Sequence, residues 1–255
     1  MVKIAIPPSI TSIGRHAFDL CSSLQQIYIP FSVTSIEDYA FYKCKSLEQV
    51  TISSSVTKIG KFAFSECAKL TQIIIPPSVT RIGDYAFFEC TSLDQITISN
   101  SINSIPDCSF FESKSLTKMT IPSSVTRIGI NAFSYCDSLF EVFIPSSVTK
   151  IDDFAFNFCH SLMKVSIPSS VREIGSNSFS GCTALKQINI PSSVKIIGSY
   201  AFYQCSSLIT ISIPSSVTSI GELAFCGCQK AQVSIPSSCN ISGTGLDECI
   251  NVMII

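Results

Sequence analysis

The sequence predicts an α/β solenoid, in which short coils stack and each coil buries the open face of the next. Two observations carry this prediction. The isoleucine of the Ile6-Pro7 pair returns every 23 residues as far as Ile213, and then after 22 residues at Ile235. Within each unit the apolar residues also return at the same places. Matched apolar positions need one shared environment, and stacking provides it without a central globular core.

We divide the chain accordingly into one solenoid over residues 1–255, with a half unit at 1–5, ten full units from 6 to 234, and a degenerate unit at 235–255. The unit IPSSVTRIGINAFSYCDSLFEVF, residues 121–143, represents the repeat. Its L-x-x-I-x-I step, completed by the next unit, alternates β-branched residues and meets a proline, which predicts a short strand. Stacked units would join these strands into a parallel sheet.

The rest of the unit predicts the elements that close the coil. The V-T-x-I step is also β-branched and predicts a second extended piece, which the following glycine column turns. The x-x-A-F-x-x-C step directs Ala, Phe and Cys inward on one helical turn, so we expect a short helix or a 3₁₀ turn there. A serine at the fourth position of every unit predicts hydrogen bonds to buried backbone groups, not a row of nucleophiles.

The pattern L-x-x-I-x-I-P-x-x-V-T-x-I-G-x-x-A-F-x-x-C resembles the BspA-type, or Treponema-like, leucine-rich repeat from the first residue to about Val233. The resemblance implies a right-handed, curved solenoid with the parallel strands on its concave face and the helical or 3₁₀ turns on its convex side. It also implies a non-catalytic role, since members of this class act mostly as surface antigens, adhesins or binding scaffolds.

Neither metal binding nor catalysis finds support in the residues. The 13 cysteines include nine in one column, where packed free thiols are the favoured interpretation and disulfides between adjacent coils the alternative. His16 and His160 fall in different columns, so no zinc site and no Ser-His pair is assembled. No phosphate-binding glycine loop appears. We therefore expect no enzyme, no cofactor and no metal.

Composition narrows the class of partner. The chain has 17 basic and 18 acidic residues, a net charge of −1, so a nucleic acid is not an expected partner. No apolar stretch has the length of a membrane helix and no secretory segment begins the chain, which favours the cytoplasm, whereas the family resemblance favours the cell surface. Both locations stay open. A first strand without a polar cap predicts end-to-end self-association.

The outward positions of the concave strands are the expected binding face. Uncharged amides and hydroxyls with a few large apolar residues suit a protein or glycan contact, and an apolar group around Phe143 marks its strongest point. The candidate residues are Gln26, Tyr28, Gln49, Gln72, Ile74, Gln95, Lys118, Phe140, Glu141, Phe143 and Lys164. The predicted function is a non-catalytic binding or adhesion module, with an intracellular protein-interaction scaffold as the alternative.

Overall fold

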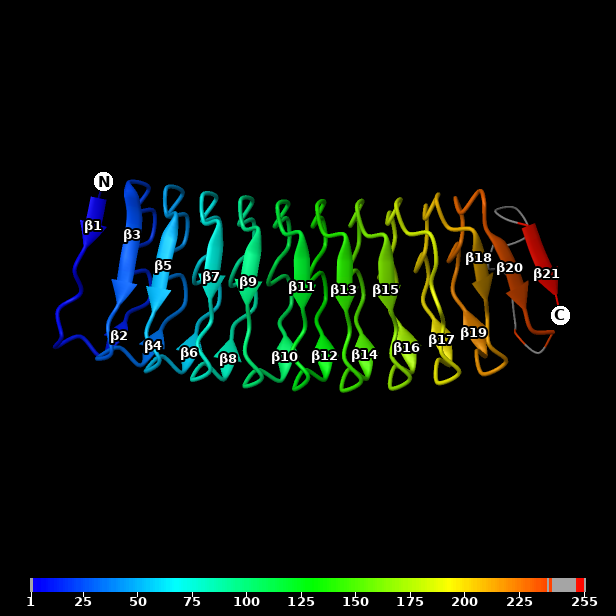
Figure 1. The fold of residues 1–255 in the computed structure, drawn as a ribbon, viewed down its shortest axis with the longest axis horizontal. Coiled ribbons are helices and arrows are strands. Elements are labelled where there is room, and N and C mark those ends of the chain that lie inside the picture. The colour runs from blue at the N-terminus through cyan, green and yellow to red at the C-terminus, as the bar shows by residue number, and fades with distance from the viewer. Residues whose placement is uncertain (1, 238, 240–250, 255) are drawn as a thin grey trace.

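A computed structural model of the chain describes residues 2–237, 239 and 251–254. The coils stack in one row from the N-terminus to the C-terminus, and most coils carry a long strand and a short strand (Figure 1). Strands of adjacent coils pair in parallel, with partners 23 residues apart in the regular units, such as Glu141 with Lys164. The predicted solenoid with a parallel sheet is therefore confirmed.

The long strands form one face of the stack, called here the long-strand face. They are β1 (Val2–Ile4), β3 (Leu24–Ile29), β5 (Gln49–Ile52), β7 (Gln72–Ile74), β9 (Gln95–Thr97), β11 (Lys118–Thr120), β13 (Glu141–Phe143), β15 (Lys164–Ser166), β18 (Thr210–Ser212), β20 (Gln232–Ile235) and β21 (Asn251–Ile254). Gln187 continues this row between β15 and β18 through single bridges to Lys164 and Thr210. The last strand, β21, pairs with β20 in parallel and so extends the row into the degenerate unit.

The short strands form a second face, called here the short-strand face. They are β2 (Ser12–Ile13), β4 (Ser35–Ile36), β6 (Lys58–Ile59), β8 (Arg81–Ile82), β10 (Ser104–Ile105), β12 (Arg127–Ile128), β14 (Lys150–Ile151), β16 (Glu173–Ile174), β17 (Ile196–Ile197) and β19 (Ser219–Ile220). They correspond to the second extended piece that the sequence predicts.

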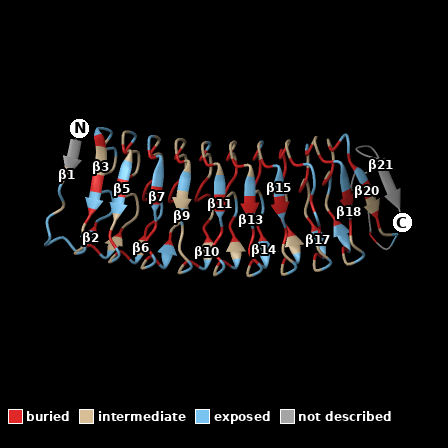
Figure 2. Cartoon of the chain, in the orientation of Figure 1, coloured by how far each residue is buried: buried red, intermediate tan, exposed pale blue. Residues whose placement is uncertain are grey.

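The core runs through the centre of the stack and is built from the predicted columns. Buried and exposed residues alternate along the strands (Figure 2), so that in β13 only Val142 is buried. The phenylalanine column from Phe18 to Phe225 forms a continuous stack, with ring centroids 5.1–5.6 Å apart and planes within 9°. Each ring therefore buries both faces against the rings of adjacent coils, except at the ends of the column.

The turns that close the coils are not helical, which corrects the predicted fold class from α/β to a β-solenoid. None of the described residues lies in an α-helix or a 3₁₀-helix. The physical reason lies in two columns of the turn, where residues such as Asn131 and Tyr135 adopt φ values of 53° and 59°. A right-handed helix cannot continue through such residues.

Hydrogen bonds between coils hold these turns in place of a helical ladder. The Asn131, Phe133 and Tyr135 amides donate to carbonyls of the next coil, at 3.1, 2.8 and 2.8 Å. The residues between them donate locally, as Ala132 does to Gly129 at 3.2 Å. Every second amide thus serves the stack, and the turns form a third ladder along the solenoid.

Side chains inside the stack satisfy the remaining carbonyls. Six hydroxyls of the serine column donate to a carbonyl of the preceding coil at 2.5–2.8 Å, which supports the predicted hydrogen-bond ladder; they belong to Ser55, Ser124, Ser147, Ser170, Ser193 and Ser216. The thiols of the cysteine column donate to phenylalanine carbonyls of the preceding coil, as Cys136 Sγ does to Phe110 at 3.1 Å. Ser113, which replaces cysteine in one unit, makes the equivalent bond to Phe87 at 3.3 Å.

The strand ladders are interrupted before the divergent unit at 98–120. Neither β8 and β10 nor β9 and β11 belong to one sheet, although the turn ladder continues between these coils. In neighbouring coils the residue after the short strand donates to the preceding isoleucine carbonyl, as Gly129 does to Ile105 at 2.9 Å. Pro106 has no N–H, so Ile82 does not receive this bond. The stack therefore continues through this unit, but on fewer hydrogen bonds.

Candidate functional site

The predicted binding residues lie on the long-strand face or at its edge. Tyr28, Ile74 and Phe143 expose 51%, 69% and 65% of their surface, far more than the core residues beside them. Gln49, Gln72, Gln95, Lys118, Glu141 and Lys164 are also exposed, whereas Gln26 and Phe140 are half-buried. The sequence therefore separates inward from outward residues correctly along this face.

Strand register brings these residues together in two groups. Gln26, Gln49, Gln72 and Gln95 pair in order across β3, β5, β7 and β9. Lys118, Glu141 and Lys164 pair in order across β11, β13 and β15. The interruption between β9 and β11 separates the two groups, so the long-strand face has a neutral part and a charged part.

Phe140, Phe143 and Met163 lie on two adjacent coils in the charged part, and these three residues together are called here the apolar patch. Met163, which is 48% exposed, follows Phe140 in the same column and donates its amide to the Phe140 carbonyl at 3.0 Å. The Lys118 ammonium lies 5.1 Å from the centroid of the Phe140 ring, a cation–π distance. Phe140 is thereby held beside the strand, while Phe143 projects from it.

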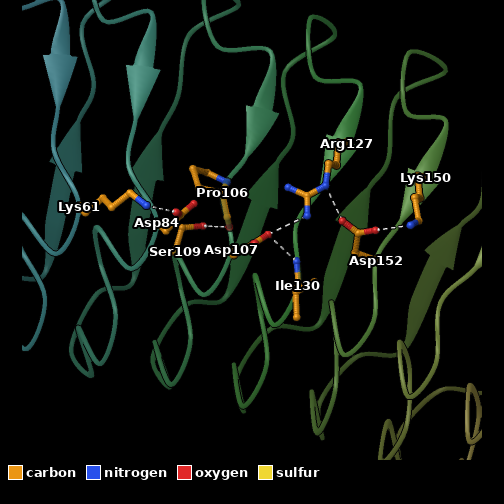
Figure 3. A network of polar contacts seen from close by, with 9 residues as sticks. All are labelled: Lys61, Asp84, Pro106, Asp107, Ser109, Arg127, Ile130, Lys150 and Asp152. Carbon is orange, nitrogen blue, oxygen red and sulfur yellow. Dashed lines mark hydrogen bonds and ion pairs between the residues drawn. The ribbon is translucent and has the colours of Figure 1, made fainter.

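The short-strand face carries charges that pair with one another. Arg127 contacts Asp107 at 2.9 Å and Asp152 at 2.5 Å, and Lys150 contacts Asp152 at 3.0 Å (Figure 3). Lys61 contacts Asp84 at 2.9 Å in the same view. Arg127, Lys150 and Lys61 on this face are thus paired with acidic residues of their own or neighbouring coils, and give a weaker basis for a binding site than the long-strand face.

The acidic residues before the turns also have a structural role. Asp38, Asp107 and Asp153 each accept the amide of a residue in the next coil, at 2.9, 2.9 and 2.7 Å. A second set of carboxylates lies on the turns, where Glu89 stands between Glu66 and Glu112. Burial, together with these two negative charges, raises the pKa of Glu89.

The buried thiols are chemically protected. Burial raises the pKa of Cys90 and of Cys182 to about 12, so both remain protonated at neutral pH. The thiolate is the reactive form of cysteine, and almost none of these thiols is in that form at neutral pH. The cysteines in the described part of the chain are free, and those of the buried column act as hydrogen-bond donors.

No cluster of three potential metal ligands occurs among residues 2–237, 239 and 251–254. His16 contacts Asp19 at 2.8 Å on the surface, and His160 lies 4.0 Å from Asp137, so neither imidazole meets a serine. The described strands and turns also include no helix with the length and apolarity to cross a membrane.

Comparison with models of known protein families tests whether the chain belongs to the family that its repeat resembles. The model of the BspA type leucine rich repeat region matches residues 1–114, 58–183 and 128–252. The chain belongs to this family. A search of curated proteins gives no significant match.

Several solved structures are similar to this leucine-rich repeat chain. A leucine rich cell surface protein from Faecalibacterium prausnitzii is 31% identical, with a TM-score of 0.47, over 91% of this chain and 78% of that chain. The Treponema pallidum leucine rich repeat protein is 28% identical, with a TM-score of 0.48, over 80% and 76%. The pneumococcal vaccine antigen PcpA is 22% identical, with a TM-score of 0.59, over 90% and 69%, and supports the fold.

Three exceptions to the repeat were not predicted to affect the surface of the solenoid. Ser53 and Ser99 stand where the other units have proline, and each precedes a gap in the long-strand ladder. Phe31, which is 68% exposed, occupies a column that is otherwise proline, serine or asparagine in the neighbouring units. A column-by-column comparison would have identified all three as exceptions.

Proposed function

We propose that the chain, as one solenoid over residues 1–255, is a non-catalytic module that binds a protein partner through the long-strand face, as a surface protein of its family. The observation that carries the proposal is the apolar patch of Phe140, Phe143 and Met163. Aromatic residues and methionine are enriched in protein interfaces, and an apolar cluster outside the core marks such a site.

The surroundings of the patch support a protein in preference to a glycan. Lys118 and Lys164 flank the patch on adjacent strands, with Glu141 between them in register. This is an apolar centre with a charged rim, the usual arrangement of a protein interface. The rim would contribute orientation, and the apolar centre would contribute most of the binding free energy.

The test compares two exposed apolar residues on different faces. Immobilised wild type, Phe143→Asp and Ile196→Asp are exposed to fractions of secreted and cell-surface proteins, and the retained proteins are quantified by mass spectrometry. Ile196 is the matched control because it is 43% exposed in β17 on the short-strand face. We expect at least one protein whose retention falls by about tenfold for Phe143→Asp alone, since a buried charge costs more than 1.4 kcal/mol.

Calorimetry with that purified protein must reproduce the loss. Equal retention by all three chains would overturn the proposal. Binding that survives protease treatment of the fraction would indicate a glycan instead.

The intracellular scaffold is distinguished by its thiols. Alkylation of native material after denaturation, without reductant, would label all thiols if the chain comes from a reducing compartment. Blocked thiols would favour an exported protein.

A further inference from the structure

The long-strand face has a hollow between β5 and β7, of about 430 Å³, in the range of small-ligand sites. We propose that this hollow is a second binding subsite, which receives an uncharged apolar side chain of a protein partner together with the peptide groups on either side of it. The inference rests on the proposed function because both sites lie on one face, but it has its own residues and its own test.

The hollow exists because the strand ladder opens. β5 pairs with β3 at four positions, from Gln26–Gln49 to Ile29–Ile52, whereas β5 pairs with β7 at Gln49–Gln72 alone. β7 and β9 pair at three positions. The pairs that would join residues 50–52 to residues 73–75 are therefore missing.

Ser53 follows β5 directly at this opening. Its amide donates to the Ile29 carbonyl at 3.2 Å, a bond that proline cannot make in the corresponding place of other units. Its hydroxyl donates to the Pro30 carbonyl at 3.0 Å and contacts Ser55 Oγ at 2.7 Å. The end of β5 is thus tied to the preceding coil, and we infer that this tie leaves the ladder toward β7 open.

The lining of the hollow selects its occupant. The residues that line the hollow are Gln49, Val50, Thr51, Ile52, Gln72, Ile73 and Ile74. Ile74 is 69% exposed and offers most of the apolar surface, whereas Val50 and Ile73 are buried. No charged residue lines the hollow, so an ionised side chain placed there would lose hydration without gaining a partner. An apolar side chain would instead bury its surface against Ile52 and Ile74.

The missing ladder pairs between β5 and β7 favour an occupant that carries peptide groups. Backbone donors and acceptors of β5 and β7 that lack ladder pairs can bond to the amides and carbonyls of an extended segment, which is how peptides add to sheet edges. The amide side chains of Gln49 and Gln72 in the lining offer further donors and acceptors. An apolar residue within a peptide chain satisfies both parts of the site.

The test uses blocked amino acids as probes, because they carry one side chain between two peptide groups. Methyl-labelled protein is titrated with the N-acetyl methylamides of leucine, phenylalanine, aspartate and lysine, and methyl chemical shifts are followed by NMR. We expect the leucine and phenylalanine compounds to shift the methyl signals of Val50, Ile73 and Ile74 in a saturable way. The aspartate and lysine compounds should leave these signals in place.

Three variants make the result specific. Ser53→Pro removes the bond to Ile29 and should weaken binding of the leucine compound by about tenfold or more. Ser99→Pro, the same change two units later, should not alter it. Ile74→Asp places a charge in the lining of the hollow without touching the core and should also weaken binding, which keeps the test valid if Ser53→Pro fails to fold.

Equal shifts with all four compounds, or full binding by Ile74→Asp, would overturn the inference. Phe143→Asp separates this site from the apolar patch. If only the proposal about the hollow is wrong, the leucine and phenylalanine compounds do not bind, while partner binding still depends on Phe143. If the proposed function alone is wrong, the probes still bind and no partner is lost in Phe143→Asp.

Discussion

Replacing Phe133 by alanine should remove a central support of the solenoid. The Phe133 ring is fully buried and stacks at 5.3 Å on Phe110 and at 5.2 Å on Phe156. Truncation of a buried phenylalanine costs about 3–5 kcal/mol, from lost transfer free energy and the cavity left behind. Two aromatic pairs, each worth about 0.5–1.5 kcal/mol, are lost as well, so we expect a value at the upper end of that range.

Two further variants serve as comparisons for the loss of stability expected in Phe133→Ala. Phe18 occupies the same column, but it is half-buried and stacks on one described ring, at 5.1 Å, so Phe18→Ala should cost about half as much. Gln95 is exposed in β9, and Gln95→Ala should change the free energy of unfolding by less than about 0.5 kcal/mol.

Urea unfolding followed by far-UV circular dichroism measures all three variants, with the change in midpoint converted through a shared m-value. Agreement between the backbone signal and the near-UV tyrosine signal checks that the stack unfolds as one unit. Similar losses for Phe133→Ala and Gln95→Ala, or a loss below about 1 kcal/mol for Phe133→Ala, would refute the assignment of inside and outside.

Three further outcomes follow from local contacts. Burial raises the pKa of Cys90 to about 12, so the contribution of this thiol to stability is full below about pH 8.5 and falls above it by up to about 1.4 kcal/mol per pH unit. Cys90→Ser should reduce the alkaline slope by this share in urea titrations, while the other buried thiols keep the rest. Glu89→Gln removes one of three adjacent negative charges and should raise the free energy of unfolding by less than about 1 kcal/mol, with a smaller gain at high salt. Glu66→Gln also loses the contact with Lys43 and should therefore give no such gain. The Asn103 amide, which donates to no described acceptor, should exchange faster with deuterium than the Thr126 amide, which donates to Asn103 at 2.9 Å; equal rates would contradict the interrupted ladder.

The repeat period and the core columns could be predicted because burial acts on each unit in the same way. Val142 and Phe133 lie in the interior for the same reason as their counterparts in every coil, so recurrence in the sequence reports burial directly. The outward residues of the long strands follow from the same alternation. This is why most of the candidate residues are exposed on the long-strand face, as the sequence predicts, whereas Gln26 and Phe140 are half-buried.

The turn was predicted wrongly because the pattern was judged within one unit. Ala132 and Cys136 lie four residues apart and both are buried, as a helix would place them, yet their turn bonds to the next coil at every second amide. The missed signal lies in the two columns with positive φ. They contain no valine, isoleucine or threonine in any unit, and one column has Gly181 and Gly227. β-branched residues are the ones that tolerate this backbone region least.

The openings of the long-strand face depend on single exceptions to the repeat. Ser53 is visible in the sequence, but its effect depends on which carbonyl the preceding coil presents and on how far β5 then lies from β7, and only coordinates supply both. The core beneath changes little, since Val50 and Ile73 stay 8% and 2% exposed. Serine in place of proline after β5 therefore coincides with an opening of the outer face above an unchanged core, so the residues expected to alter binding differ from those that maintain the fold.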